Sequence, residues 1–161
     1  MSIMDKISSQ YIIPVLRETD EEKLYSLAKS LAEGGLKVLE VTLMNDSALK
    51  VIKRLSVDKE LMIGAGTVLD QSAAEKAMEA GAKFRNNNFP FSPGVRTPKE
   101  IMQAVSLGCE VVKIFPVNTL GGVSYLKNLK GPFPELKVMA SGGIGLDDIR
   151  DYYEIGTFCL G

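Results

Sequence analysis

Short runs of apolar and β-branched residues alternate with stretches of helical periodicity along this sequence. We expect buried strands at residues 11–16, 37–43, 61–68, 89–95, 109–117, 137–144 and 157–161. Helices are expected between them, at residues 20–33, 46–55, 71–80, 97–107, 122–130 and 146–154. Repeated strand–helix units predict an α/β fold in which helices cover parallel strands. Two architectures satisfy this pattern, an eight-stranded (β/α)8 TIM barrel and an open doubly wound sheet.

One stretch interrupts the alternation. Residues 85–88 (Arg-Asn-Asn-Asn) break a run that begins at Lys83, and no helical stretch follows them. The sequence has 161 residues and ends directly after its last strand, whereas barrels usually have about 250 residues. Loss of a strand would leave a barrel with two exposed edges, so we favour residues missing from a longer chain over a lost unit. We expect one TIM-barrel domain, residues 1–161, without one strand–helix unit near residues 85–88 and without the C-terminal helices.

Composition and charge exclude several classes of protein. Apolar residues make up 45% of the chain, and the formal net charge is −1, which does not favour nucleic acid or an acidic membrane surface as a partner. No apolar run approaches the roughly 18 residues of a membrane span, and residues 1–10 lack the apolar core of a signal peptide. We therefore expect a cytoplasmic protein.

The residue types that usually bind metals are scarce. The chain has no histidine, and its two cysteines, Cys109 and Cys159, lie in separate apolar runs without a CxxC pair. Both cysteines are interpreted as buried, reduced thiols. Histidine-based catalysis is excluded, and we expect neither a metal nor a cofactor.

Charged residues interrupt two strands that should be apolar. Glu40 lies on the opposite strand face from Val41, and in a barrel this face would line the interior. Lys113 alternates in the same way with Ile114, near the C-terminal end of its strand. Thr67 also ends a strand, after small residues that leave space inside. A buried charge without a partner costs several kcal/mol (~3–5), so these groups must pair, lose their charge or serve chemistry.

Two structural interpretations compete with a functional one. Lys113 and Glu40 could form an ion pair that only holds the barrel together, or they could lie at sheet edges facing water. Their position favours function, because barrel enzymes carry reactive groups at the C-terminal strand ends. A lysine in a pocket that excludes water attacks carbonyl groups as a neutral amine, and a nearby carboxylate can then move protons. Lys113 and Glu40 fit these two roles.

A glycine turn follows the strand at residues 137–140. Ser141, Gly142 and Gly143 precede the next helix, so their backbone N–H groups can approach an anion. In barrels, phosphate often binds at the loops after the seventh and eighth strands, and this turn follows the seventh strand if the interrupted run at Lys83 is counted as one. A tight turn that needs positive φ is the alternative interpretation. Residues 64–66 (Gly-Ala-Gly) lack the remainder of a dinucleotide-binding fingerprint.

Five motifs together resemble the 2-keto-3-deoxy-6-phosphogluconate and 4-hydroxy-2-oxoglutarate aldolases. They are residues 39–43 (Leu-Glu-Val-Thr-Leu), 64–68 (Gly-Ala-Gly-Thr-Val), 92–95 (Ser-Pro-Gly-Val), 112–116 (Val-Lys-Ile-Phe-Pro) and 141–144 (Ser-Gly-Gly-Ile). They occur in the order of the family and span nearly the whole chain. The resemblance implies a class I aldolase that releases pyruvate and an aldehyde from a small-molecule 2-oxo acid, and a homotrimeric assembly.

The same resemblance implies roles for particular residues. Lys113 matches the Schiff-base lysine, and Glu40 matches the general acid/base. The implied substrate-binding residues are Thr67 near the pyruvate moiety, Arg17 at an anionic end, Pro93 and Phe115 as pocket walls, and Ser141, Gly142 and Gly143 as the phosphate-binding turn.

Two departures from the family leave alternatives open. Met44 stands where many members have an arginine that holds the pyruvate carboxylate. A further strand and helix of the family are missing near residues 85–88, as are the C-terminal helices. A phosphate-binding epimerase or isomerase with Lys113 as an electrostatic group, and a non-catalytic barrel that binds a sugar acid, are therefore alternative functions. Which 2-oxo acid is the substrate stays open.

Overall fold

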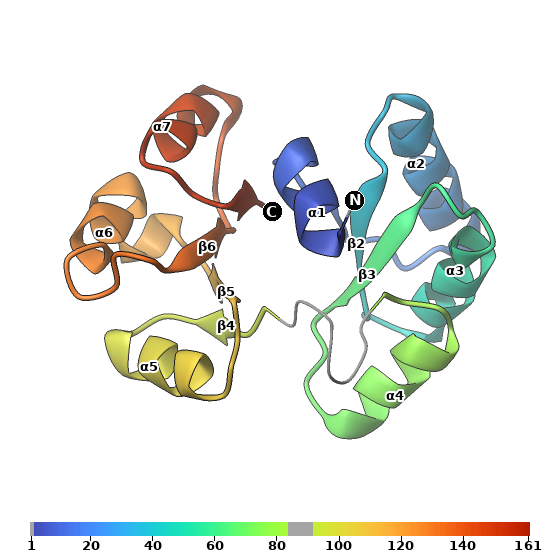
Figure 1. The fold of residues 1–161 in the computed structure, drawn as a ribbon. Coiled ribbons are helices and arrows are strands. Elements are labelled where there is room, and N and C mark those ends of the chain that lie inside the picture. The colour runs from blue at the N-terminus through green and yellow to red at the C-terminus, as the bar shows by residue number, and fades with distance from the viewer. Residues whose placement is uncertain (1, 84–91) are drawn as a thin grey trace. The chain divides into compact units, whose positions relative to one another are not determined.

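The computed structural model describes residues 2–83 and 92–161 and divides the chain into two compact units, residues 1–89 and 90–161. Each unit contains one sheet of parallel strands with helices packed on it (Figure 1). The expectation of an α/β fold with parallel strands is confirmed. The interruption at residues 85–88 and the first part of the strand expected at residues 89–95 lie outside the described residues.

The first unit has a three-stranded sheet with the strand order β1-β2-β3. Its elements are α1 (Ile3–Gln10), β1 (Val15–Leu16), α2 (Glu21–Glu33), β2 (Val38–Thr42), α3 (Asp46–Ser56), β3 (Met62–Gly66) and α4 (Gln71–Glu79). Asp20, Asn45 and Asp70 accept backbone N–H groups at the starts of α2, α3 and α4, where short polar side chains are favoured.

The apolar core of this unit lies between the sheet and its helices. Leu39 and Val41 of β2 and Ile63 of β3 are almost completely buried, together with Leu24 of α2 and Ile52 of α3. Strand side chains alternate between the two faces, so the core defines the helix-covered face of the sheet. Glu40 consequently belongs to the opposite face.

Helix α1 was not expected from the sequence, and it is held by its last residue. The Gln10 side-chain oxygen accepts hydrogen bonds from the backbone N–H groups of Lys37 (2.7 Å) and Val38 (2.8 Å), and Nε2 donates to the Val38 carbonyl (2.7 Å). These bonds attach α1 to the start of β2. Helix α1 does not lie beside α2 and α3 (Figure 1). The Gln10 bonds satisfy backbone groups where β2 begins.

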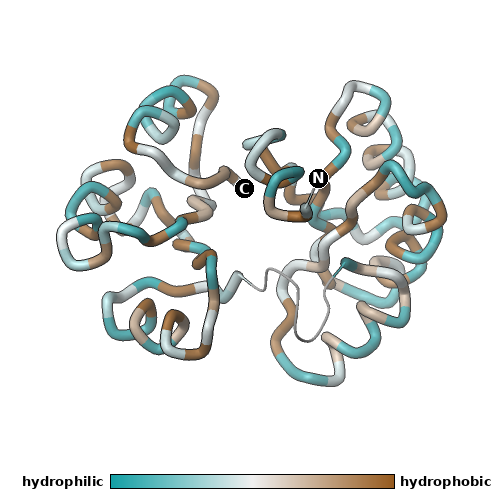
Figure 2. Tube along the Cα trace, in the orientation of Figure 1, coloured by the Kyte–Doolittle hydropathy of each residue, from teal (hydrophilic) through white to brown (hydrophobic). Residues whose placement is uncertain are grey.

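The second unit has a four-stranded sheet with the strand order β4-β5-β6-β7. Its elements are β4 (Gly94–Val95), α5 (Pro98–Ser106), β5 (Val111–Ile114), η1 (Asn118–Leu120), α6 (Gly122–Leu129), β6 (Lys137–Ala140), η2 (Leu146–Asp148), α7 (Ile149–Glu154) and β7 (Cys159–Leu160). Figure 2 shows hydrophilic and hydrophobic residues alternating along the helices, as expected where one helix face is buried.

Two further expectations concern the cysteines and membrane spans. Cys159 is a buried free thiol, as expected, whereas the expectation of a buried Cys109 is wrong, because this free thiol is only half-buried. Among the helices that the structure describes, none is long and apolar enough to cross a membrane.

Candidate active site

Glu40 and Gly66 form a close contact at the C-terminal half of β2 and β3. Glu40 is half-buried on the sheet face opposite the helices, in register with Gly64. A side chain at Gly66 would overlap the Glu40 carboxyl group, because a Cβ there would lie 2.8 Å from the carboxyl carbon. The space left by Gly66 therefore accommodates the carboxylate, in agreement with the expectation that small residues leave room inside.

Thr67 has a strained backbone directly after β3. Its φ is 56°, in the left-handed region that β-branched residues rarely adopt. The residue is exposed and lies one position beyond the end of β3 rather than inside the strand expected at residues 61–68. Strain of this kind tends to concentrate at functional sites, so Thr67 stays a candidate for substrate contact.

Arg17 extends the Glu40 face of the same sheet. It follows β1, where Val15 is in register with Glu40, while Leu16 packs into the core on the other face. Alternation therefore assigns exposed Arg17 to the face of Glu40. The first unit thus brings Glu40, Arg17 and Thr67 to the C-terminal edge of one sheet.

Met44 lies at this edge and supplies no charge. It follows β2, its side chain is 55% exposed, and its backbone N–H donates to the Thr42 carbonyl at 2.9 Å. The next residue, Asn45, caps α3 and donates from its side chain to the Thr19 carbonyl at 3.1 Å. An exposed thioether therefore occupies the position at which the resemblance implies an arginine.

Lys113 lies in β5, in the second unit, between neighbours with small or flexible side chains. Its register partners are Gly94 of β4 and Met139 of β6, and its backbone N–H donates to the Pro93 carbonyl at 2.9 Å. Lys113 is half-buried, whereas Ile114, which faces the other side of the sheet, is fully buried. The alternation expected from the sequence is confirmed. Half-buried Pro93 lies just before β4, beside Lys113 in the sheet.

The turn after β6 packs on the segment that follows β5. Gly142 and Gly143 have φ values of 94° and 75°, so both need the freedom of glycine. A Cβ at Gly142 would lie 2.9 Å from the Pro116 Cα and 3.0 Å from a ring carbon of Phe115. Buried Ser141 accepts a hydrogen bond from the Val117 N–H at 2.8 Å through its carbonyl oxygen. The glycine turn therefore adjoins the end of the strand that carries Lys113.

Asn118 holds this turn, and sequence reasoning missed it. Its backbone N–H donates to the Gly142 carbonyl at 3.2 Å, and its Oδ1 accepts the Thr119 N–H at 2.8 Å. Its side-chain amide lies against Gly143, where a Cβ would be 2.9 Å from the Asn118 Cβ. Within residues 92–161, none of the described hydrogen bonds uses the Asn118 Nδ2 donor. No local sequence signal identifies this residue, because Asn118 follows β5 whereas Gly143, which it contacts, follows β6.

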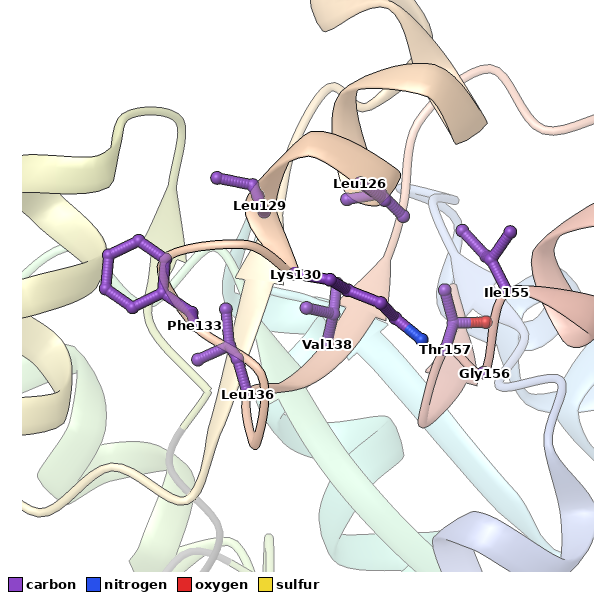
Figure 3. A pocket seen from close by; sticks show the side chains of 9 residues that line it. All are labelled: Leu126, Leu129, Lys130, Phe133, Leu136, Val138, Ile155, Gly156 and Thr157. Carbon is purple, nitrogen blue, oxygen red and sulfur yellow. The ribbon is translucent and has the colours of Figure 1, made fainter.

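Two hollows among the described residues lie at the N-terminal ends of the strands, away from the C-terminal ends that carry the candidate residues. One lies among α6, the start of β6 and the segment before β7, and has room for about one water (about 10 Å³) (Figure 3). Its lining is mostly apolar: Leu126, Leu129, Lys130, Phe133, Leu136, Val138, Ile155, Gly156 and Thr157. The other, of about 210 Å³, lies where β2 and β3 begin and is lined by Lys6, Ser9, Lys37, Val38, Glu60 and Met62. Neither hollow contains a candidate residue.

Among the described residues, no group of three or more His, Cys, Asp or Glu side chains is arranged to hold a metal ion.

The sequence matches one aldolase family over almost its entire length. Residues 3–161 match the family described as "Aldolase: KDPG and KHG aldolase", for 2-keto-3-deoxy-6-phosphogluconate and 4-hydroxy-2-oxoglutarate. A 2-dehydro-3-deoxy-phosphogluconate aldolase of Haemophilus influenzae is 36% identical, over 95% of this chain and 79% of the relative. A KHG/KDPG aldolase of Escherichia coli is 32% identical, over 93% of this chain and 78% of the relative.

Solved structures agree with the sequence matches. A KDPG aldolase from Legionella pneumophila, with pyruvate captured as a covalent carbinolamine intermediate, superposes with a TM-score of 0.90 and 29% identity, over 100% of this chain and 86% of that one. The aldolase of Zymomonas mobilis ZM4 with 3-phosphoglycerate gives a TM-score of 0.88 and 29% identity, over 99% and 84% of the two chains.

These similarities define the class of protein first: a class I aldolase, a lyase that works through a Schiff base. The chain belongs to the KDPG and KHG aldolase family. The family and the reaction class expected from the five motifs are confirmed.

Proposed function

We propose that this chain splits a 2-keto-3-deoxy-6-phosphogluconate-like or 4-hydroxy-2-oxoglutarate-like acid through a Schiff base on Lys113. The observation that carries the proposal lies within the second unit. Lys113 stands two residues before Phe115, and Phe115 packs against the Gly142 backbone. An amine that attacks keto groups is thus next to a backbone turn suited to an anion. A 2-oxo acid with a second anionic group fits this combination.

The proposed reaction begins with attack of the Lys113 amine on the C2 keto carbon. The carbinolamine loses water to give an iminium ion, which withdraws electrons from the C3–C4 bond. Glu40 removes the proton of the C4 hydroxyl, so the bond breaks and the aldehyde leaves while C2, C3 and nitrogen become an enamine. Glu40 then returns a proton to C3, and water releases pyruvate from Lys113.

The remaining candidate residues are proposed to bind and orient the substrate. Thr67 and Arg17 would contact the pyruvate half, and Pro93 and Phe115 would form walls of the pocket. Ser141, Gly142 and Gly143 would bind the distal phosphate or carboxylate through backbone N–H groups, assisted by the Asn118 amide. Support comes from the strained Thr67 backbone and from the glycine turn held by Asn118.

Two structural neighbours support these assignments. The Legionella pneumophila aldolase was captured with pyruvate as a carbinolamine, the covalent species proposed for Lys113. The Zymomonas mobilis enzyme was solved with 3-phosphoglycerate, a phosphorylated carboxylic acid.

Borohydride trapping tests the proposal. Incubation with pyruvate and borohydride should add a stable mass to a peptide that contains Lys113, with loss of activity. The Lys113→Met variant should not be modified, and Lys130→Met, which changes a lysine at the far end of the second sheet, should be modified like the wild type. Recovery of active, unmodified enzyme would overturn the proposal. Isomerase or epimerase activity without trapping would instead favour the alternative function, in which Lys113 acts through its charge and forms no covalent bond with the substrate.

We also propose a larger organisation for the enzyme. All described strands in both sheets are parallel, and the aligned relatives are aldolases, which supports a single (β/α)8 barrel domain. Family resemblance supports a homotrimer in the cytoplasm. One cooperative unfolding transition, seen alike by fluorescence and circular dichroism, and a light-scattering mass of three chains would be the expected results.

A further inference from the structure

Thr42 ends β2 on the sheet face that carries Glu40. Residues two apart in a strand share a face, whereas Leu39 and Val41 belong to the core under the helices. Thr42 is in register with Gly66, the residue against which the Glu40 carboxylate packs. The Glu40 side chain therefore extends along the strand toward the level of Thr42.

The Thr42 hydroxyl is a buried polar group that forms no hydrogen bond with the described residues. Only 5% of Thr42 is exposed, and Oγ1 has no hydrogen-bond partner within residues 2–83 and 92–161. Buried hydroxyl groups nearly always have a partner, and an unsatisfied one costs free energy that a valine of similar shape would avoid. A partner that appears only during the reaction would explain why a threonine stands at this position.

We propose that Thr42 is a positioning residue that hydrogen-bonds the Glu40 carboxyl group while Glu40 transfers protons. The inference rests on the proposed function, because it assigns those transfers to Glu40. A carboxyl group that exchanges protons alternates between an acceptor-only and a protonated state, and a hydroxyl group can donate to the first and accept from the second. On the same sheet face, β3 contributes Gly64 and Gly66, and strand alternation assigns the charged residue Arg17, just after β1, to this face as well.

Exchange of the pyruvate methyl protons with solvent measures the proton transfer between Glu40 and C3 separately from cleavage of the C3–C4 bond. In the iminium ion between pyruvate and Lys113, Glu40 takes a proton from C3, the C–H electrons form the C2–C3 double bond, and the C2–N π electrons return to nitrogen. In D2O the carboxyl group exchanges its proton with solvent and returns a deuteron to C3. The exchange rate can be followed by NMR, while borohydride trapping reports imine formation after long incubation.

Thr42→Val removes the hydroxyl and keeps the shape, and Thr42→Ser keeps the hydroxyl. We expect Thr42→Val to melt at the wild-type temperature or above, to form the trapped imine, and to exchange protons about tenfold more slowly with little change in KM. Thr42→Ser should exchange near the wild-type rate although it is less stable.

Three results would overturn the inference. They are wild-type exchange in Thr42→Val, equal slowing in Thr42→Val and Thr42→Ser, and a KM effect without a rate effect. Thr42→Ala, which also lacks the hydroxyl, gives the same test if the valine variant does not fold. Absence of trapping in the wild type would instead refute the Schiff-base proposal itself.

Discussion

The Glu40 carboxyl group occupies the space that a side chain at Gly66 would fill, so its position requires a glycine there. The two residues come from adjacent strands, β2 and β3, and Gly66 is in register with Thr42 rather than with Glu40. Gly66 itself is buried. The position of the proposed acid/base therefore depends on a glycine that has no chemistry of its own.

Gly66→Ala should lower activity without unfolding the protein. The new methyl group would force the Glu40 carboxyl group away, since a Cβ there lies 2.8 Å from its carboxyl carbon. We expect kcat to fall about 100-fold, the scale of one general acid/base, and imine trapping on Lys113 to persist. Steady-state kinetics and mass spectrometry provide the measurements. Gly131→Ala is a matched control, because a Cβ there makes only an ordinary 3.6 Å contact; equal activity losses in both variants would contradict the explanation.

Asn118→Asp should weaken binding of phosphorylated substrates selectively. Aspartate keeps an oxygen for the Thr119 N–H, but it loses the amide donor beside Gly143 and adds a negative charge. KM for a phosphorylated aldol should rise about tenfold or more, while KM for an unphosphorylated one changes little. Kinetics with both substrates would measure the difference. Asn128→Asp, on α6, is the control for added charge, and an equal rise for both substrates would argue against a role for Asn118 at the distal end.

Much of the fold could be predicted because its signals are local. The cap residues Asn45 and Asp70 lie within three residues of the groups they bind, and strand alternation identified the faces of Glu40 and Lys113. Helix α1 could not be predicted in this way. Its apolar residues are few (Ile3, Met4 and Ile7), none of them is buried, and its attachment depends on Gln10 bonds to residues 27 and 28 positions away.

The lengths of strands, and residues such as Asn118 that hold another loop in place, were harder to predict, because both depend on neighbouring strands. Apolar residues 11–16 indicate a strand of six residues, yet β1 comprises only Val15 and Leu16, since only these pair in register with β2. Asn118 is similar, as a polar residue in a loop becomes informative only when Gly143 is found beside it. Lys113 and Glu40, by contrast, were visible as charges in apolar strands.

Ionised Glu100 should stabilise the folded protein at neutral pH, and this contribution should be lost in acid. Backbone N–H groups of Arg96 and Thr97 donate to its carboxylate and hold its pKa below the ordinary value. A lowered pKa in the folded state gives stability that is present above the unfolded pKa, about 4.3, and is lost as the pH falls through the folded pKa. Glu100→Gln should therefore melt at a lower temperature than the wild type at pH 7, with the difference shrinking below about pH 4.

Thermal unfolding between pH 7 and pH 2.5 measures this effect. Glu79→Gln is a suitable control, because among the described residues no hydrogen bond or ion pair of the exposed Glu79 side chain is found. A difference between Glu100→Gln and wild type that stays constant down to pH 2.5 would mean that the Glu100 charge is not its source.

Met44→Arg should improve binding of the pyruvate half of the substrate. Met44 is exposed just after β2, the strand that carries Glu40, and the family resemblance of the sequence implies an arginine at its position. A guanidinium group there could bind the 2-oxo acid carboxylate with two charge-assisted hydrogen bonds. A gain of about 1.5–3 kcal/mol corresponds to a KM for pyruvate about 10- to 100-fold lower, measured by the rate of methyl-proton exchange. Met44→Gln, which adds polarity without charge, should change KM little. An unchanged KM in Met44→Arg would show that another group already binds the carboxylate, and Arg17→Met should then raise KM.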